Sequence, residues 1–419
     1  MMSRPRVLVT NWESSDNLGD HAILAAQVAF LEDTVGACVR LLGNQPGVSF
    51  PSDLAKRHCA DSPWPSPWRH GTVAWVRGLL LAAVSLISPA AASCVSSAHA
   101  AVVRTISTAD VVMPKGGGYF LADGSPRRCL FLLRMLYPLL LARRLGVARV
   151  LWGHSIGPVH GRPARALMRM ALGGAEIVVR DEASVDVCRA LGLHAGRAPD
   201  FALLSGADAR PSRRTTPVTA QVHVGVTAKR VSANPRVQAG YIDAMSSALT
   251  LLAESAAHEA TRAVFHLVPQ VIGPTPQEDD RPVLAELAKK LPSLPLLHEE
   301  RPETIAAAVA LYGEFDFVLA TRLHSAILAA CAGTPFAVYG YVGGKARGFV
   351  QDVGLPSWVT TSELEQIPRM TLRCFEARRE LRVRLESGLD HARARLEQLR
   401  LSVGEQSTAW STADGAGVC

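Results

Sequence analysis

Short apolar runs alternate with helix-patterned segments along this chain, and this alternation restricts the fold more than any other feature. The first run, RVLVT at Arg6–Thr10, is followed after a polar turn by HAILAAQVAFLEDT, whose apolar residues recur at helical spacing. Further apolar runs, each followed by a helix-like segment, lie at Ala109–Gly118, Ala148–Pro158 and Glu176–Glu182. Strands and helices in alternation predict an α/β fold with a parallel sheet and crossover helices.

A second alternating series follows a stretch that has lost its apolar periodicity. Its strands are expected to begin near His223, Ala263, Phe315 and Pro335. The 419 residues suffice for two domains, and 48% apolar with 19% charged residues is typical of a globular protein. We therefore predict an N-terminal Rossmann-like domain at 1–205, a linker at 206–220, a C-terminal Rossmann-like domain at 221–375, an amphipathic helix at 376–403 and a disordered tail at 404–419.

The net charge indicates which partners to expect, and the cysteines indicate the redox state and whether a metal site is expected. The net charge of +7 comes mostly from arginine, which suits carboxylate and phosphate groups and equally suits the inner face of an anionic membrane. Because no nucleic-acid-binding motif accompanies the charge, nucleic acid is not expected as a partner. The 8 cysteines include no CxxC pair, which favours reduced thiols, and no metal site is predicted.

An uncharged apolar segment at Gly78–Val103 bears on the location of the protein. It contains no Asp, Glu, Lys or Arg, but Pro89 interrupts it and SCVSSAHA is too polar for the centre of a bilayer. We expect a buried or interfacial helix, with contact to a membrane surface left open. The first residues offer no apolar signal-peptide region, so we expect a cytoplasmic protein, with the inner face of the membrane as an open alternative.

Polar residues follow the predicted strands, at the edge where open parallel sheets bind ligands. Asn17 and Asp20 open the first helix, where backbone N–H groups hold anions, although Asp20 is equally well explained as a helix cap. Gly117 and Gly118 lie in a glycine run that either admits a ligand close to the backbone or forms a tight turn. His154 lies in another glycine-flanked turn at the same predicted edge.

Arginines mark two further strand ends. Arg180 is a bidentate donor for a carboxylate or phosphate, unless it forms an ion pair with Asp181, Glu182 or another acid. Arg322 and His324 lie at a strand-to-helix junction. There an arginine can hold an anion beside a histidine that exchanges protons near neutral pH.

A basic loop follows the last predicted strand. Lys345 and Arg347 belong to the sequence GGKARGF, at the expected start of a helix. They could bind an anion together with the helix N-terminus. Solvated surface charge is the alternative interpretation.

Taken in order, several motifs resemble those of polysaccharide pyruvyl transferases. They are NLGDHAIL, PKGGGYF, GHSIGP, VVRDEASVDVCRALG with the later PDFALL, VPQVIGP followed by EDD, and TRLHSAILAACAGTPFAVYGYVGGKARGF with QDVGL, spanning roughly Arg6 to Pro356. The resemblance implies two Rossmann-like domains similar to a GT-B glycosyltransferase, with the active site in the interdomain cleft. It also implies transfer of pyruvate from phosphoenolpyruvate to paired hydroxyls of a sugar, forming a pyruvate ketal in cell-envelope or exopolysaccharide biosynthesis.

The resemblance also implies roles for individual residues. Arg322 and His324 match the family's RLH motif, whose histidine is regarded as the proton-transfer residue. Arg180 matches the arginine of its RDE-type motif, and Asp20 matches the acid after the N-terminal glycine. The chain departs from the family's usual pattern at two places, which bear on the preference for the acceptor sugar. It has His21 where many relatives have an acid, and GHSIGP where they often have GQGIGP.

The chemistry of phosphoenolpyruvate fits these side chains without a cofactor. Arg180 and Arg322, together with Lys345 or Arg347, could neutralise its carboxylate and phosphate. Protonation of its methylene carbon creates an electrophilic centre, and we hypothesise that His324 donates this proton or assists phosphate departure. Asp20 is the hypothesised base for a sugar hydroxyl, with His21 or His154 as competing candidates.

The predicted partners are phosphoenolpyruvate and a sugar or lipid-linked glycan acceptor, with peripheral membrane contact through Gly78–Val103 left open. Two other functions remain as alternatives. A nucleotide-sugar-dependent glycosyltransferase would share the two-domain shape and release a nucleotide. A non-catalytic glycan- or membrane-associated protein would have a decayed site, against which the intact Asp20, Arg180, Arg322 and His324 argue.

Overall fold

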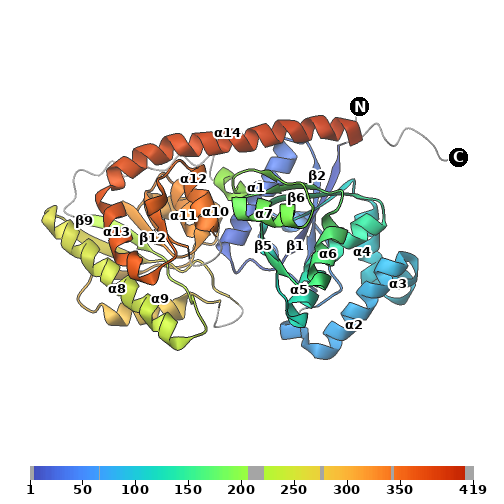
Figure 1. Ribbon diagram of the computed structural model, residues 1–419, viewed down its shortest axis with the longest axis horizontal. Coiled ribbons are helices and arrows are strands. Elements are labelled where there is room, and N and C mark those ends of the chain that lie inside the picture. Colours follow the sequence, from blue (N-terminus) through green and yellow to red (C-terminus); the bar gives the residue numbers. More distant parts are fainter. Residues whose placement is uncertain (1–3, 66, 206–220, 274–277, 341–343, 411–419) are drawn as a thin grey trace. The chain divides into compact units, whose positions relative to one another are not determined.

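The computed structural model describes residues 4–65, 67–205, 221–273, 278–340 and 344–410 and divides them into two compact units (Figure 1). The N-terminal unit comprises the described residues of 1–15, 23–200 and 396–419. The C-terminal unit comprises 16–22 and the described residues of 201–395. Each unit contains its own parallel sheet, as the strand–helix alternation predicts.

The sheet of the N-terminal unit has the order β3-β2-β1-β4-β6-β7-β8, and β5 pairs with β6. All of these pairings are parallel. Buried valine and leucine side chains dominate the central strands, which is typical of a parallel sheet covered on both faces. The strands are β1 (Arg6–Trp12), β2 (Cys38–Gly43), β3 (His58–Asp61), β4 (Val111–Pro114), β5 (Gly117–Asp123), β6 (Ala148–His160), β7 (Glu176–Val179) and β8 (Gly196–Arg197).

Helices connect these strands. The buried side of α5 packs on β4, β5 and β6, while α2 packs on α5 and α4 and lies with α3 at the periphery of the unit (Figure 1). The helices are α1 (Leu18–Asp33), α2 (Pro67–Ile87), α3 (Pro89–Val95), α4 (Ser97–Ser107), α5 (Pro126–Arg144), α6 (Arg162–Leu172) and α7 (Glu182–Ala190), with a 3-10 turn η1 at Ala55–Arg57.

The sheet of the C-terminal unit has the order β11-β10-β9-β12-β13-β14, again with parallel pairings. Its central strands β9, β10, β12 and β13 supply the buried core. The strands are β9 (Gln221–Val226), β10 (Arg262–Leu267), β11 (Leu296–His298), β12 (Phe317–Ala320), β13 (Phe336–Tyr339) and β14 (Thr360–Thr361). The helices are α8 (Pro235–His258), α9 (Arg281–Lys290), α10 (Ile305–Gly313), α11 (Leu323–Cys331), α12 (Lys345–Asp352), α13 (Ile367–Glu376) and α14 (Arg378–Trp410), with 3-10 turns η2 (Phe201–Leu204), η3 (Ser357–Val359) and η4 (Leu364–Gln366).

The two units are not contiguous in sequence, whereas a contiguous 1–205 domain was the expectation. Residues 16–22 belong to the C-terminal unit because their backbone pairs with the segment after β10. Asn17 forms an antiparallel bridge with Val271, and the Leu18 amide donates to the Gln270 carbonyl at 3.3 Å. A hydrophobic pattern cannot reveal an isolated pairing of this kind.

The C-terminal end also differs from expectation. The terminal helix α14 begins at Arg378 and continues to Trp410, so part of the expected tail at 404–419 is helical. The expected linker at 206–220 lies outside the described residues. The apolar segment Gly78–Val103 forms parts of α2 and α4 and all of α3. None of the helices within the described ranges combines the length and apolar character needed to cross a bilayer.

Candidate functional site

The junction between β12 and α11 holds two of the predicted site residues. Arg322 is the N-cap residue of α11, and His324 lies in the first turn of that helix. Thr321 fixes the junction: its hydroxyl bonds the Tyr241 hydroxyl at 2.7 Å, and its amide donates to the Thr227 hydroxyl at 3.2 Å. These hydrogen bonds hold the junction at the N-terminus of α11, where the first N–H groups of a helix have no acceptor within the helix itself.

A buried carboxylate holds Arg322 in place. The Asp280 side chain is only 1% exposed and lies 2.6 Å from the Arg322 Nη2, while the Arg322 Nε donates to both Asp280 oxygens at 2.9 and 3.0 Å. Asp280 also accepts the backbone amides of Gln270 and Val271 at 3.0 and 2.9 Å. Arg322 itself is 16% exposed, and none of the described residues accepts a hydrogen bond from its Nη1. One edge of the guanidinium thus remains available to an anion.

The segment Asp16–Ala22 packs directly on His324. A Cβ atom added to Gly19 would lie 2.3 Å from the His324 Nδ1, so the glycine backbone rests against the imidazole. Asn17 organises the segment, since its Oδ1 accepts the Gly19 amide at 3.0 Å and its Nδ2 donates to the Asp20 carboxylate at 2.9 Å. The segment that carries Asn17 and Asp20 therefore lies against His324 through Gly19.

Gln270 and Ser325 complete this group, which we call the RLH cluster (Gly19, Asp20, Gln270, Asp280, Arg322, His324 and Ser325). The Ser325 hydroxyl donates to the Gln270 Oε1. Gln270 is buried, and its Nε2 meets no acceptor among the described residues. A buried amide donor beside the histidine can contribute a hydrogen bond to a bound substrate.

Lys345 and Arg347 lie near the neighbouring strand end. β13 is parallel to β12, and α12 begins at Lys345 after the chain leaves β13. Gly344 is its N-cap residue with φ 73°, a left-handed conformation that favours glycine. Lys345 is half-buried and Arg347 is exposed, so both interpretations of this loop, anion binding and surface charge, remain compatible with the structure.

In the N-terminal unit, the glycine run begins a strand rather than forming the turn that was one prediction. Gly117 is the first residue of β5 and pairs with His154 of β6, and Gly118 follows it in the strand. Gly117 is buried and Gly118 half-buried. Lys115, which sequence reasoning passed over, lies buried just before the strand, with its Nζ 5.8 Å from the Tyr119 ring centroid.

His154 is fully buried, which contradicts its predicted contact with a ligand or a sugar hydroxyl. Its Nδ1 lies 2.9 Å from the Trp152 carbonyl, and its Nε2 lies 3.1 Å from the Tyr119 hydroxyl. Burial, reinforced by the charges of Arg180 and Lys115, lowers the pKa of His154 to about 3 although its backbone hydrogen bonds oppose the shift. The imidazole is therefore neutral and orients Tyr119.

Arg180 is held by an ion pair, as its alternative interpretation allowed, but the partner is Asp200. Both side chains are buried. The Arg180 Nε donates to the Ser155 hydroxyl at 2.8 Å, and that hydroxyl donates to Asp181, the N-cap residue of α7. None of the described residues accepts a hydrogen bond from the Arg180 Nη2. Arg180 is thus fixed in position and retains one donor for an anion.

Comparisons with solved structures identify the fold. The chain is similar to a glycosyltransferase from Rickettsia africae ESF-5 with a TM-score of 0.56 and 10% identity over 99% of this chain and 100% of that chain. It is similar to a sucrose-phosphate synthase from Thermosynechococcus elongatus with a TM-score of 0.56 and 12% identity over 98% and 100%. It is also similar to a UDP-GlcNAc 2-epimerase from Neisseria meningitidis with a TM-score of 0.51 and 10% identity over 94% and 99%. These likenesses confirm two parallel-sheet α/β domains of the GT-B type.

Sequence comparison identifies the family. A search of curated protein sequences found no match. The family model of polysaccharide pyruvyl transferases matches residues 17–342, a range that begins at Asn17 and includes Asp280, Arg322 and His324. Since this match covers most of the sequence, the chain belongs to the polysaccharide pyruvyl transferase family.

Proposed function

We propose that this protein transfers pyruvate from phosphoenolpyruvate to two hydroxyls of one glycan sugar, releasing phosphate and forming a pyruvate ketal. Membership of the family supports this activity. The observation that carries the proposal is the RLH cluster, where His324 lies in the first turn of a helix next to an arginine fixed by a buried carboxylate. A proton-transfer group and a positive charge are thereby held at one strand end.

We assign the anionic groups of phosphoenolpyruvate to the ends of β12 and β13 in the sheet of the C-terminal unit. The available Nη1 of Arg322 and the N–H groups at the start of α11 suit one anion. Lys345 begins α12 after the adjacent parallel strand and suits a second anion, with Arg347 beside it. Oriented donors of this kind stabilise charge without reorganising during the reaction.

The reaction then follows from proton transfer. His324 donates a proton to the methylene carbon of phosphoenolpyruvate, and C2 becomes electrophilic. One sugar hydroxyl forms a bond to C2 while its proton passes to Asp20, whose carboxylate is oriented by Asn17 at 2.9 Å. Phosphate leaves C2, the second hydroxyl closes the ketal, and its proton passes to the departing phosphate. Asp20 then loses its proton to solvent and His324 regains one from solvent. One phosphoenolpyruvate and one diol give one ketal and one inorganic phosphate.

The experiment that tests this proposal measures phosphate release from phosphoenolpyruvate with a panel of sugar, nucleotide-sugar and lipid-linked acceptors. Mass spectrometry of the same reactions looks for the pyruvyl adduct. His324→Ala should abolish both signals. His391→Ala, which removes an exposed histidine from α14, should leave them unchanged. The acceptor that turns over also tests the assignment to cell-envelope or exopolysaccharide glycans.

A nucleotide-sugar-dependent glycosyltransferase is the second candidate, and the fold likeness to glycosyltransferases is the observation that favours it. In that case the same panel would yield no pyruvyl adduct, and a nucleoside diphosphate would be released from a nucleotide sugar. Release that persists in His324→Ala would further separate this activity from pyruvyl transfer.

A further inference from the structure

The outward face of α2 is apolar. Large aliphatic side chains recur along it at three- and four-residue spacing, at Val73, Val76, Leu80, Val84 and Ile87. Val73 is 85% exposed, Leu80 62% and Ile87 76%. The outward face of a helix in a globular protein is normally polar, so exposed aliphatic side chains in one line mark an interaction surface.

The opposite face of α2 is firmly packed, so the aliphatic face cannot turn inward. Gly78 lies against the preceding loop: a Cβ atom there would be 2.8 Å from the Pro65 side chain and 3.0 Å from that of Trp64. Farther along, Ala82 is buried, and the Ser85 hydroxyl lies 3.0 Å from the Tyr137 hydroxyl of α5. The inner face also places Trp75, Leu79 and Leu86 against the core, so the five aliphatic side chains of the outward face are those left pointing away.

The charges around this face are positive. No Asp or Glu occurs between Asp61 and Asp110. Arg77 is the one charged side chain of the described outward face, and Arg144 adds a second at its C-terminal end, where its Nη2 donates to the Ile87 carbonyl at 3.3 Å. Exposed aliphatic side chains flanked by arginine and without acids match the composition of the boundary between anionic lipid headgroups and acyl chains.

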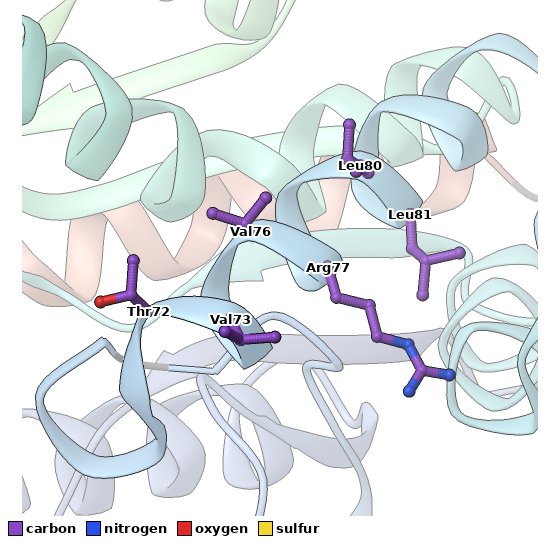
Figure 2. Close-up of a pocket in the computed structure, with 6 residues that line it drawn as sticks. All are labelled: Thr72, Val73, Val76, Arg77, Leu80 and Leu81. Carbon is purple, nitrogen blue, oxygen red and sulfur yellow. The ribbon is translucent and has the colours of Figure 1, made fainter.

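Figure 2 shows the surface in detail. The figure draws a pocket on this surface whose lining residues all come from one stretch of α2. They are Thr72, Val73, Val76, Arg77, Leu80 and Leu81. A single helix does not enclose a small molecule. An extended partner that accepts a row of side chains fits this surface better.

We propose that α2 docks the protein on an anionic lipid bilayer, with its axis parallel to the membrane surface. Val73, Leu80 and Ile87 enter the acyl boundary, while Arg77 and Arg144 contact lipid phosphates. Among the residues of α2 whose side chains the structure describes, none is an exposed aromatic, the kind that anchors protein interfaces, and a bilayer requires no shape complementarity. A second copy of the chain is the competing occupant. The proposal is independent of the reaction proposed above.

The test is co-sedimentation of the full chain with vesicles. Phosphatidylcholine vesicles are compared with vesicles that also contain phosphatidylglycerol, at low and high salt. The protein should bind the anionic vesicles and lose affinity as salt rises. The combined variant Val76→Gln, Leu80→Gln and Ile87→Gln should bind at least about tenfold more weakly, because the buried apolar area falls.

Two matched variants and one further measurement complete the design. Val383→Gln removes a 70% exposed valine from α14 and should bind as the wild type does. Arg77→Gln should reduce binding to anionic vesicles and its salt dependence. Wild-type protein that binds neither vesicle overturns the proposal, as does a triple variant that binds normally. Sedimentation that shows a wild-type dimer dissociated by the triple variant assigns the face to a second copy instead.

Discussion

Replacing Gly19 with alanine should reduce turnover about 10²-fold while the fold is retained. The new Cβ would lie 2.3, 2.4 and 2.6 Å from the Nδ1, Cγ and Cβ atoms of His324, whereas ordinary van der Waals contact begins near 3.4 Å. The imidazole or the segment that carries Gly19 must therefore move by about 1 Å, and a misplacement of that size can cost ~10²-fold in rate. Helix propensity alone acts in the opposite direction and would favour alanine by about 1 kcal/mol.

The assay is phosphate release from phosphoenolpyruvate with the acceptor that the panel identifies, together with thermal unfolding. Gly240→Ala is the matched control, since Gly240 lies in α8 and its new Cβ would meet only the Leu364 Cδ1 at 3.9 Å. That variant should be slightly stabilised and fully active. A Gly19→Ala protein that unfolds like the wild type and turns over at the wild-type rate would refute the placement of this backbone against His324.

Three further predictions follow from the described contacts. Asp280→Asn should lower turnover and the urea midpoint of unfolding, because disrupting a buried pair commonly costs about 3–5 kcal/mol. Asp279→Asn, next to it, should change both far less, because Asp279 pairs with Arg281, whose side chain is 60% exposed. The pKa of His154 is lowered from 6.5 to about 3, so between these pH values the unfolded chain binds a proton that the folded chain does not. The free energy of unfolding should therefore fall by up to about 1.4 kcal/mol per pH unit as the pH drops from 6.5 toward 3. His154→Gln should flatten that slope in urea unfolding followed across pH, and an equal slope in both proteins would contradict the buried position of His154. Turnover should survive treatment with EDTA because arginine, lysine and helix N-termini supply the positive charge, and loss of activity that added divalent ions restore would contradict this assignment.

Much of the fold could be predicted from local pattern. Each strand of a parallel sheet is a short buried run, and the helix after it has its own period, so β9, β10, β12 and β13 were all located near their observed positions. The position of Arg322 and His324 at a strand-to-helix junction was predictable for the same reason. The order of strands and helices can therefore be predicted from sequence, because burial on both faces makes each strand a continuous apolar run and each helix keeps its own spacing of apolar residues.

Contacts between distant segments could not be predicted in this way. Asp280 is 42 residues from Arg322, and although EDD was recognised as a motif, nothing local identifies which acid is buried beneath the arginine. Gly19 gave no signal that it packs on His324, because its role depends on the absence of a side chain at one contact. His154 was placed at a ligand-binding edge by its glycine neighbours, but whether a strand-end side chain points into the core is decided by the β5–β6 pairing.

The most direct test of pyruvyl transfer is to run the reaction in D₂O and to examine the methyl group of the ketal by mass spectrometry and NMR. If the methylene carbon of phosphoenolpyruvate is protonated during transfer, the wild-type product should carry one solvent deuterium in that methyl group, and His324→Gln should form little or no ketal. A product without solvent deuterium, or a His324→Gln protein that forms the labelled ketal at the wild-type rate, would contradict the assignment of His324 as the proton donor.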